Sequence, residues 1–265
     1  MLDPAMIAPA LASGAAIGLV LGLVGGGGSI LAVPLLVYVV GVKSPHAAIG
    51  TAAVAVALNA ASSLAGHARS GSVKWPCASV FALAGVIGAA LGAEAGKAID
   101  GQRLLGLFGL LMIVIGAVML RGRKGEGSPD VRLDRASAAV LLPRLIPIGL
   151  TVGLMAGFFG IGGGFLIVPG LMLATGMPLR AAIGTSLVVV TSLGLTTAAS
   201  YALSGYVDWT LVALLVAGGA AGSYGGLTLG RRLTSKHRTL EIGFALLVIV
   251  IGLYVAGRGV QPIIS

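Results

Sequence analysis

Two glycine-rich stretches of the sequence could bind a ligand through the backbone alone. The first covers residues 22–34 and contains four consecutive glycines followed by Ser29, and the second covers residues 157–169. Glycine leaves neighbouring N–H groups open to close approach, and a helix that begins after such a bend adds partial positive charge. Because Ser29 is a good N-cap residue, we predict that a helix N-terminus faces the first bend. The chemistry indicated is the binding of a small anion without a buried Arg or Lys.

The two stretches match each other along their length. Broken helices at corresponding positions of two repeated halves are typical of transporter binding sites. The alternative is that the glycines only let helices cross closely, as small residues do in membranes. The matching positions favour the binding site. Adding 135 to the residue numbers of Gly22, Gly25, Gly27, Gly28 and Pro34 gives Gly157, Gly160, Gly162, Gly163 and Pro169.

Hydroxyl and amide side chains form a polar stripe on the apolar segment that follows each bend region. Spacing of about 100° per residue puts them on one arc of a helix, where they could replace water around a polar substrate. Alternatively, Ser and Thr bond back to their own helix or join neighbouring helices. Asn59 is the sharpest candidate, because an amide is harder to hide in lipid. The predicted substrate-binding residues are Gly25, Gly26, Gly27, Gly28, Ser29, Thr51, Asn59, Ser62, Gly160, Gly162, Gly163, Gly164, Thr185, Ser186, Ser192 and Thr196.

The composition requires a membrane around these residues. Of 265 residues, 57% are apolar and only 9% are charged, whereas soluble domains carry roughly 25% charged residues. The mean hydropathy is +1.06. The net charge of +9 comes from basic residues in short loops between apolar segments, which is the positive-inside pattern. The charge therefore reports orientation in a bilayer and does not indicate a nucleic-acid partner.

Ten apolar segments organise the chain. Three of them, 30–42, 145–159 and 165–176, are shorter than the roughly 20 residues that cross the hydrocarbon, and they are interpreted as broken or re-entrant helices. We predict a first transmembrane repeat over residues 1–120, a cytoplasmic linker over 121–144 and a second transmembrane repeat over 145–265. The segments lie at about 5–24, 30–42, 47–68, 76–93, 104–120, 145–159, 165–176, 181–203, 210–229 and 240–257.

Loop charges indicate that the repeats are inverted. The central loop and the loop at 231–238 are basic, so both are expected in the cytoplasm. The loop at 94–103 is the first-half counterpart of the loop at 231–238, and it is formally neutral. One helix separates the loop at 94–103 from the central loop, so it is expected outside the cytoplasm. The two counterpart loops then lie on opposite sides of the membrane. The predicted fold is an all-α polytopic membrane protein with two inverted repeats of about five helical elements each and broken or re-entrant helices at the glycine-rich bends.

Motifs for other chemistries are absent from the sequence. The glycine runs lack the Lys-Ser/Thr ending of a P-loop, and three scattered histidines have no metal-ligand spacing. Cys77 is the single cysteine. We expect no enzyme activity, no cofactor and no metal site. No carboxylate is expected at membrane depth that would indicate a sodium or proton site, so the sequence does not indicate a coupling ion.

The paired G-x-x-G-x-G-G-G-x-x-x-x-x-P stretches, each followed by A-x-G-T, resemble the TauE/SafE sulfite exporter family, also called the TSUP permeases. The resemblance covers about residues 10–257. First-half Gly26 and Ser29 stand where the second half has Ile161 and Gly164, which fits divergence of duplicated halves. The resemblance implies that small sulfur-containing anions, such as sulfite and sulfonates, cross the bacterial inner membrane.

The function expected from these observations is secondary transport, with export the favoured direction, by alternating access between inverted repeats. The partners expected are a small sulfur oxyanion or sulfonate and the lipid bilayer of the bacterial inner membrane, and the sequence leaves room for a homo-oligomer. The alternatives are a passive anion channel, an uptake permease for a related small organic anion, and a membrane scaffold subunit without transport.

Overall fold

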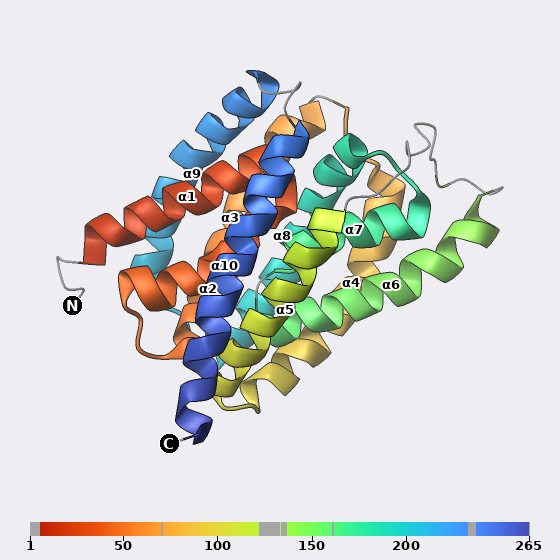
Figure 1. Cartoon of the computed structure of the whole chain (residues 1–265). Coiled ribbons are helices and arrows are strands. Elements are labelled where there is room, and N and C mark those ends of the chain that lie inside the picture. Colours follow the sequence, from red (N-terminus) through yellow and green to blue (C-terminus); the bar gives the residue numbers. More distant parts are fainter. Residues whose placement is uncertain are drawn as a thin grey trace.

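The computed structural model describes residues 6–69, 71–121, 133, 137–160, 162–232 and 237–264. The described residues form packed helices, and no strand occurs among them (Figure 1). Each expected apolar segment coincides with helical structure, so the prediction of an all-α polytopic membrane protein is confirmed. The elements are α1 (Ile7–Val24), η2 (Gly25–Leu31), α2 (Ala32–Pro34), η3 (Leu35–Val40), α3 (Pro45–Arg69), α4 (Trp75–Lys97), α5 (Gly101–Arg121), α6 (Ala138–Phe159), α7 (Gly164–Thr175), α8 (Leu179–Leu203), α9 (Trp209–Arg232) and α10 (His237–Ile264).

The length and surface of the helices fit a bilayer. Within the described ranges, α3, α4, α5, α6 and α8 each provide an apolar stretch long enough to cross a membrane. On α4, Leu83, Ile87 and Leu91 are 70%, 59% and 61% exposed. These residues recur at every fourth position and therefore form one stripe along the helix. An exposed leucine-rich stripe of this kind is stable against lipid chains, so it marks a lipid-facing side.

Helix α6 corrects one expectation about the chain. The segment 145–159 was expected to be short, but α6 begins at Ala138 and has 22 residues, including Pro143 and Pro147 inside the helix. Arg144 made the sequence look polar at this point. A long basic side chain near a helix end can place its charge at the membrane interface while its stem covers apolar surface, so it does not end the helix. Part of the expected linker 121–144 is therefore helical.

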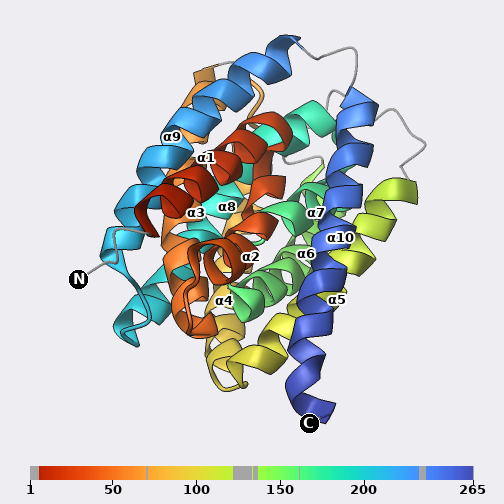
Figure 2. The same cartoon turned by 60° about the vertical axis from the view of Figure 1, so that its left-hand side comes forward.

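The central helices are α3 and α8, which pack against each other. In each of these helices, 72% of the most apolar stretch of 18 residues is buried inside the molecule, whereas in α6 the buried share is 22%. The pairs α1–α9 and α4–α6 lie on opposite sides of this centre (Figure 1), and the pair α5–α10 covers a third side (Figure 2). Neighbouring helices thus cover most of α3 and α8, and we expect a polar path through the molecule to follow these two helices.

Glycines let the outer pairs pack backbone to backbone, and the contacts of the two halves correspond. Gly18 on α1 faces the backbone of Gly219 on α9, and Gly153 on α6 faces the backbone of Gly85 on α4. Adding 135 to Gly18 gives Gly153, and adding 134 to Gly85 gives Gly219, so the two contacts are equivalent positions of the repeat. In each contact a helix of one half packs on the fourth helix of the other half. For these glycines, close helix crossing is the role that the structure shows.

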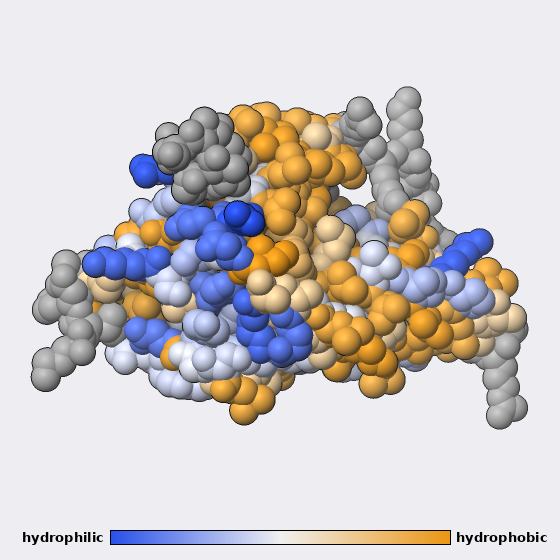
Figure 3. All heavy atoms as spheres, turned by 90° about the horizontal axis from the view of Figure 1, so that it is seen from below, coloured by the Kyte–Doolittle hydropathy of each residue, from blue (hydrophilic) through white to orange (hydrophobic). Residues whose placement is uncertain are grey.

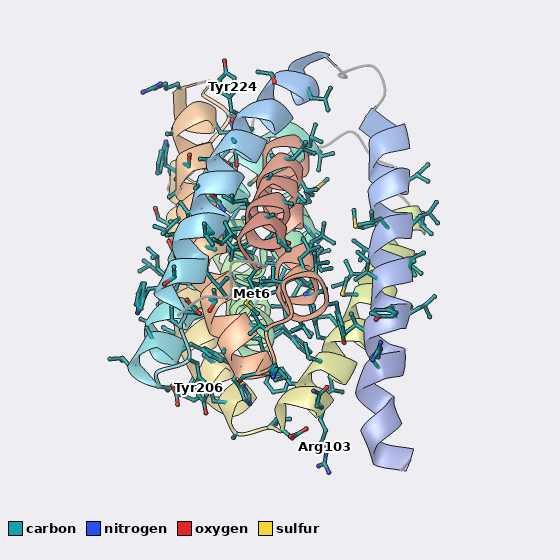
Figure 4. The ribbon with its side chains drawn as sticks, turned by 90° about the vertical axis from the view of Figure 1, so that its left-hand side faces the viewer. Met6, Arg103, Tyr206 and Tyr224 are labelled. Atoms are coloured by element: carbon teal, nitrogen blue, oxygen red, sulfur yellow. The ribbon has the colours of Figure 1, made fainter. Side chains whose placement is uncertain are left out.

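The loops expected on the outside come together at one end of the bundle. The ammonium group of Lys97, at the end of α4, lies 3.0 Å from the Ser204 hydroxyl after α8 and 2.8 Å from the Glu94 carboxylate. Tyr206 and Arg103 lie at this same end, and Tyr224 lies near the opposite end of α9 (Figure 4). Viewed from below Figure 1, hydrophilic residues gather in one area with hydrophobic surface beside it (Figure 3). The arrangement agrees with the charge-based topology, whose sidedness stays a prediction.

Candidate functional site

The second bend lies against the middle of the central helix pair. An added Cβ on Gly162 would lie 3.5 Å from a methyl group of Val56 on α3, 3.7 Å from the Cα of Gly194 and 3.8 Å from a methyl group of Val190 on α8. Val56 and Val190 are equivalent positions, since adding 134 to one gives the other, and each is near the middle of its helix. The bend therefore reaches the centre of the bundle, at the depth where a transport site is expected.

The conformation of this bend depends on glycine. Gly160, Gly162 and Gly163 have φ values of 66°, 64° and 66°, in the left-handed region that costs other L-residues about 1–2 kcal/mol. Helix α7 begins at Gly164, and the N–H groups of Leu166 and Ile167 donate hydrogen bonds to the carbonyl of Gly163. No side chain caps α7 at Gly163. The first-turn N–H groups of α7 thus face the bend, as an anion site requires.

The first bend differs from the second and from the sequence prediction. Helix α1 continues directly into the 3-10 helix η2, so Ser29 lies inside that element and is not the N-cap of a new helix. The prediction of a helix N-terminus at Ser29 is wrong, because Ser29 follows the four glycines inside η2 and begins no new helix. At Gly28 an added Cβ would meet the backbone of Ile17 and Leu21 on α1, so the chain folds back on α1. Ser29 itself is fully buried.

The two bends belong to one region of the molecule. The element η2 contacts α7 and α8, and α7 contacts α8. After η2 the chain passes through α2 into the π-helix η3 before reaching Gly41. Switches from 3-10 to α to π geometry within 16 residues are unusual, and such departures often occur at functional hinges.

Thr51 and Thr185, which were expected to line the path, are already engaged. The Thr51 hydroxyl accepts a hydrogen bond from the backbone N–H of Asp208 at 3.0 Å, and the Thr185 hydroxyl accepts one from the N–H of Lys74 at 3.0 Å. Both threonines are fully buried. Asp208 and Lys74 immediately precede α9 and α4, so each threonine anchors the start of a helix in the other half. The two bonds are equivalent under the repeat.

Removing either threonine hydroxyl should lower stability and leave anion affinity unchanged. In Thr51→Val and Thr185→Val a backbone N–H loses its acceptor at a partly buried site, where a hydrogen bond contributes about 0.5–1.5 kcal/mol net. Because the bonds are equivalent, we expect similar losses from both variants. Thermal unfolding in detergent with and without substrate measures this, and a variant that keeps its stability but loses substrate binding would contradict the anchoring role.

Three further hydroxyls of the predicted stripe bond back to their own helix and do not line a path. Ser186, Ser192 and Thr196 donate to carbonyls of their own helix, at 2.8, 3.0 and 2.9 Å. Ser62 lies on an exposed part of α3. Asn59 is 1% exposed, and its side-chain amide donates to the Leu215 carbonyl at 3.4 Å. The stripe is therefore not one continuous lining, and Asn59 is the member that keeps a free polar atom.

The sequence reasoning missed several buried hydroxyls. The side chains of Ser63, Thr197 and Ser223 are at most 3% exposed, and their hydroxyls have no hydrogen-bond partner. The repeat could have pointed to two of them, since adding 134 to Ser63 gives Thr197. Among the described residues no group of three or more His, Cys, Asp or Glu side chains could hold a metal ion.

Comparison with known proteins identifies the kind of molecule that carries this site. The model of the family described as sulfite exporter TauE/SafE matches residues 10–255. A probable membrane transporter protein of Xylella fastidiosa strain Temecula1 is 46% identical over 96% of this chain and 97% of its own length. The probable membrane transporter protein YunE of Bacillus subtilis is 28% identical over 90% of this chain and 93% of its own. No solved structure matches.

Proposed function

We propose, since this chain belongs to the sulfite exporter TauE/SafE family of membrane transporters, that it exports small sulfur-containing anions such as sulfite or organosulfonates. The chain is a multi-pass protein of the inner membrane. The observation that carries the proposal is the placement of the Gly162 bend against the middle of α3 and α8, with the first turn of α7 facing it.

The anion is held by backbone groups in this proposal. A sulfite or sulfonate group carries its charge on oxygens that accept several hydrogen bonds, and N–H groups at a helix start supply donors together with partial positive charge. Donors at Gly162, Gly163 and Gly164 form the second-half part of the site. Residues 25–28 and Ser29 form the first-half part. They lie in the 3-10 helix η2 and do not provide the N-terminus of a new helix. A site without a buried cation releases its anion readily, which suits transport.

Alternating access is supported by the correspondence between the halves. Each half makes the same contacts with the other half. The glycine contact Gly18–Gly219 corresponds to Gly153–Gly85, and the hydrogen bond at Thr51 corresponds to the one at Thr185. Two nearly equal halves can adopt two arrangements of similar energy around one central site, which exposes that site to each side in turn. The loop charges indicate that the two halves have opposite orientations in the membrane, as this mechanism requires.

Flux into proteoliposomes tests the proposal. Radiolabelled sulfite and a taurine-derived sulfonate should accumulate with saturable kinetics and exchange against unlabelled substrate inside the vesicles. Ohmic conductance in planar bilayers without counter-flow would instead identify a passive anion channel. Absence of flux above empty vesicles for every anion of the panel would refute transport of this substrate class.

Substrate binding should also stabilise the purified protein. A ligand that binds only the folded state raises the free energy of unfolding by about 2.7 kcal/mol at a concentration of 100 times its Kd. We therefore expect sulfite or a sulfonate to raise the melting temperature in a thermal-shift screen at constant ionic strength, and choline chloride to leave it unchanged. Equal shifts from all salts would mean that the screen reports ionic strength and no specific site.

A further inference from the structure

Several buried polar atoms of the helices have no hydrogen-bond partner, and three of them belong to residues on α3 and α9 that lie at one interface. Ser and Thr in a membrane helix usually bond to a carbonyl of their own helix, and Thr191 and Ser192 on α8 do so. Asn59, Ser63 and Ser223 do not follow this pattern. They are 1%, 1% and 3% exposed, and the Oδ1 atom of Asn59 and both hydroxyls have no partner.

The packing of α3 on α9 brings these three side chains to one interface. An added Cβ on Gly219 of α9 would meet the side-chain amide of Asn59 on α3. The two helices run in the same direction, because Thr51 lies by Asp208 and Asn59 lies further along by Gly219. Ser63 follows Asn59 by one turn on α3, and Ser223 follows Gly219 by one turn on α9. Residues four apart share a helix face, so both serines lie at the next level of the same interface.

The hydrogen bond of Asn59 determines which ligand its free atom accepts. Its Nδ2 atom donates to the carbonyl oxygen of Leu215, and only the nitrogen of the amide can make that bond. The Oδ1 atom is therefore the unpartnered one, and it only accepts hydrogen bonds or coordinates cations. An anion in this place would face the negative end of the amide dipole, so the group does not extend the proposed anion site.

The fold does not need an amide at position 59 or a hydroxyl at position 223. Adding 134 to Asn59 and Ser63 gives Leu193 and Thr197, and subtracting 134 from Ser223 gives Ala89. The second-half interface packs Leu193 against Gly85, where the first half packs Asn59 against Gly219. An unsatisfied buried polar group costs about 1–3 kcal/mol. Thr197 shares this cost with Ser63, but at Asn59 and Ser223 the first half gives up stability that Leu193 and Ala89 keep in the second half. A ligand that satisfies these atoms accounts for the difference.

We propose that Asn59, Ser63 and Ser223 form a binding site for one monovalent hard cation, of which Na⁺ is the test case. Hard cations take oxygen ligands, and this group offers an amide oxygen and two hydroxyl oxygens. A divalent cation is disfavoured because the three side chains carry no negative charge to offset it. The site exists in one half only, so the chain binds one such cation. Its existence does not depend on the identity of the transported anion.

The second half supplies the variants for the test. In the double variant Asn59→Leu/Ser223→Ala, the first-half interface receives the residues that the second half already packs at these positions. Thr197→Val is the matched control, because it removes an unpartnered buried hydroxyl from the other half. Binding of ²²Na⁺ to the purified full-length chain is measured by scintillation proximity, and melting temperatures are compared in NaCl and in choline chloride at equal ionic strength.

The wild-type chain and Thr197→Val should bind ²²Na⁺ saturably and melt at a higher temperature in NaCl. The double variant should lose at least tenfold in bound ²²Na⁺ and should melt at the same temperature in both salts. In choline chloride it should be at least as stable as the wild type, because it no longer buries the unsatisfied amide. A wild-type chain without specific Na⁺ binding, or a double variant that keeps it, would overturn the proposal. Neither result depends on whether sulfite flux is observed.

Discussion

Gly162→Ala should abolish anion transport while leaving a folded protein. The added methyl group has room, since its nearest neighbour would be a Val56 methyl group at 3.5 Å. The φ value of 64° is what opposes the substitution, at a cost of about 1–2 kcal/mol. Relief of that strain turns the N–H groups at the start of α7, and the methyl group occupies space at the bend. Transport in proteoliposomes should fall to the level of empty vesicles, and size-exclusion chromatography should still show a monodisperse protein.

Gly176→Ala separates the effect of position from that of strain. Gly176 ends α7, has a φ value of 72° and has nothing within 4 Å of an added Cβ. Its substitution imposes the same kind of backbone strain at the other end of the same helix. We expect a similar loss of melting temperature with transport close to the wild-type rate. If both variants transport equally well, the bend at Gly162 is not part of the transport site.

Gly153→Val should prevent stable assembly of the bundle. An added Cβ on Gly153 would lie 2.6 Å from the Cα of Gly85, so α4 and α6 would have to separate. Overpacking of a core costs about 1–3 kcal/mol when side chains can adjust, and here the obstacle is backbone, which makes the loss larger. We expect little folded protein after extraction, measured by fluorescence-detected size-exclusion chromatography.

Two further glycine variants make this result specific. Gly18→Val should fail to the same degree, because Gly18 meets the backbone of Gly219 in the equivalent contact between α1 and α9. Gly225→Ala on α9 should be neutral or slightly stabilising, since nothing lies within 4 Å of its added Cβ and alanine is the better helix former by about 1 kcal/mol. A stable Gly18→Val beside an unstable Gly153→Val would show that the two crossings do not carry equal weight.

The sequence predicts the elements of this protein well, because lipid imposes simple rules on them. Every backbone polar group must be satisfied within the membrane, so apolar segments become helices, and the ten expected segments match helical structure. The error at α6 arose from a single charge, Arg144, within a helix that begins at Ala138. The sequence also predicts the glycine positions of both bends, because the same glycine pattern occurs in each half.

Only the tertiary structure decides what the polar residues do. Thr51 and Thr185 look like lining residues on a helical wheel, but each one holds a backbone N–H that lies more than 100 positions away in the chain. Ser29 looks like an N-cap, but it lies inside the 3-10 helix η2 and begins no new helix. A hydroxyl or amide is equally suited to a ligand, a carbonyl of its own helix or a distant N–H. The choice depends on which of these partners packing brings within about 3 Å, and spacing along one helix does not contain that information.

The sequence by itself thus determined the membrane, the helices, the duplication and the two glycine bends, since these follow from hydropathy and from local backbone freedom. The tertiary structure decided that the bend at Gly162 reaches the centre of α3 and α8, and that Asn59 keeps a free oxygen at the α3–α9 interface. Both facts depend on contacts between segments far apart in the chain, which are set by how whole helices pack and not by the residues next to them.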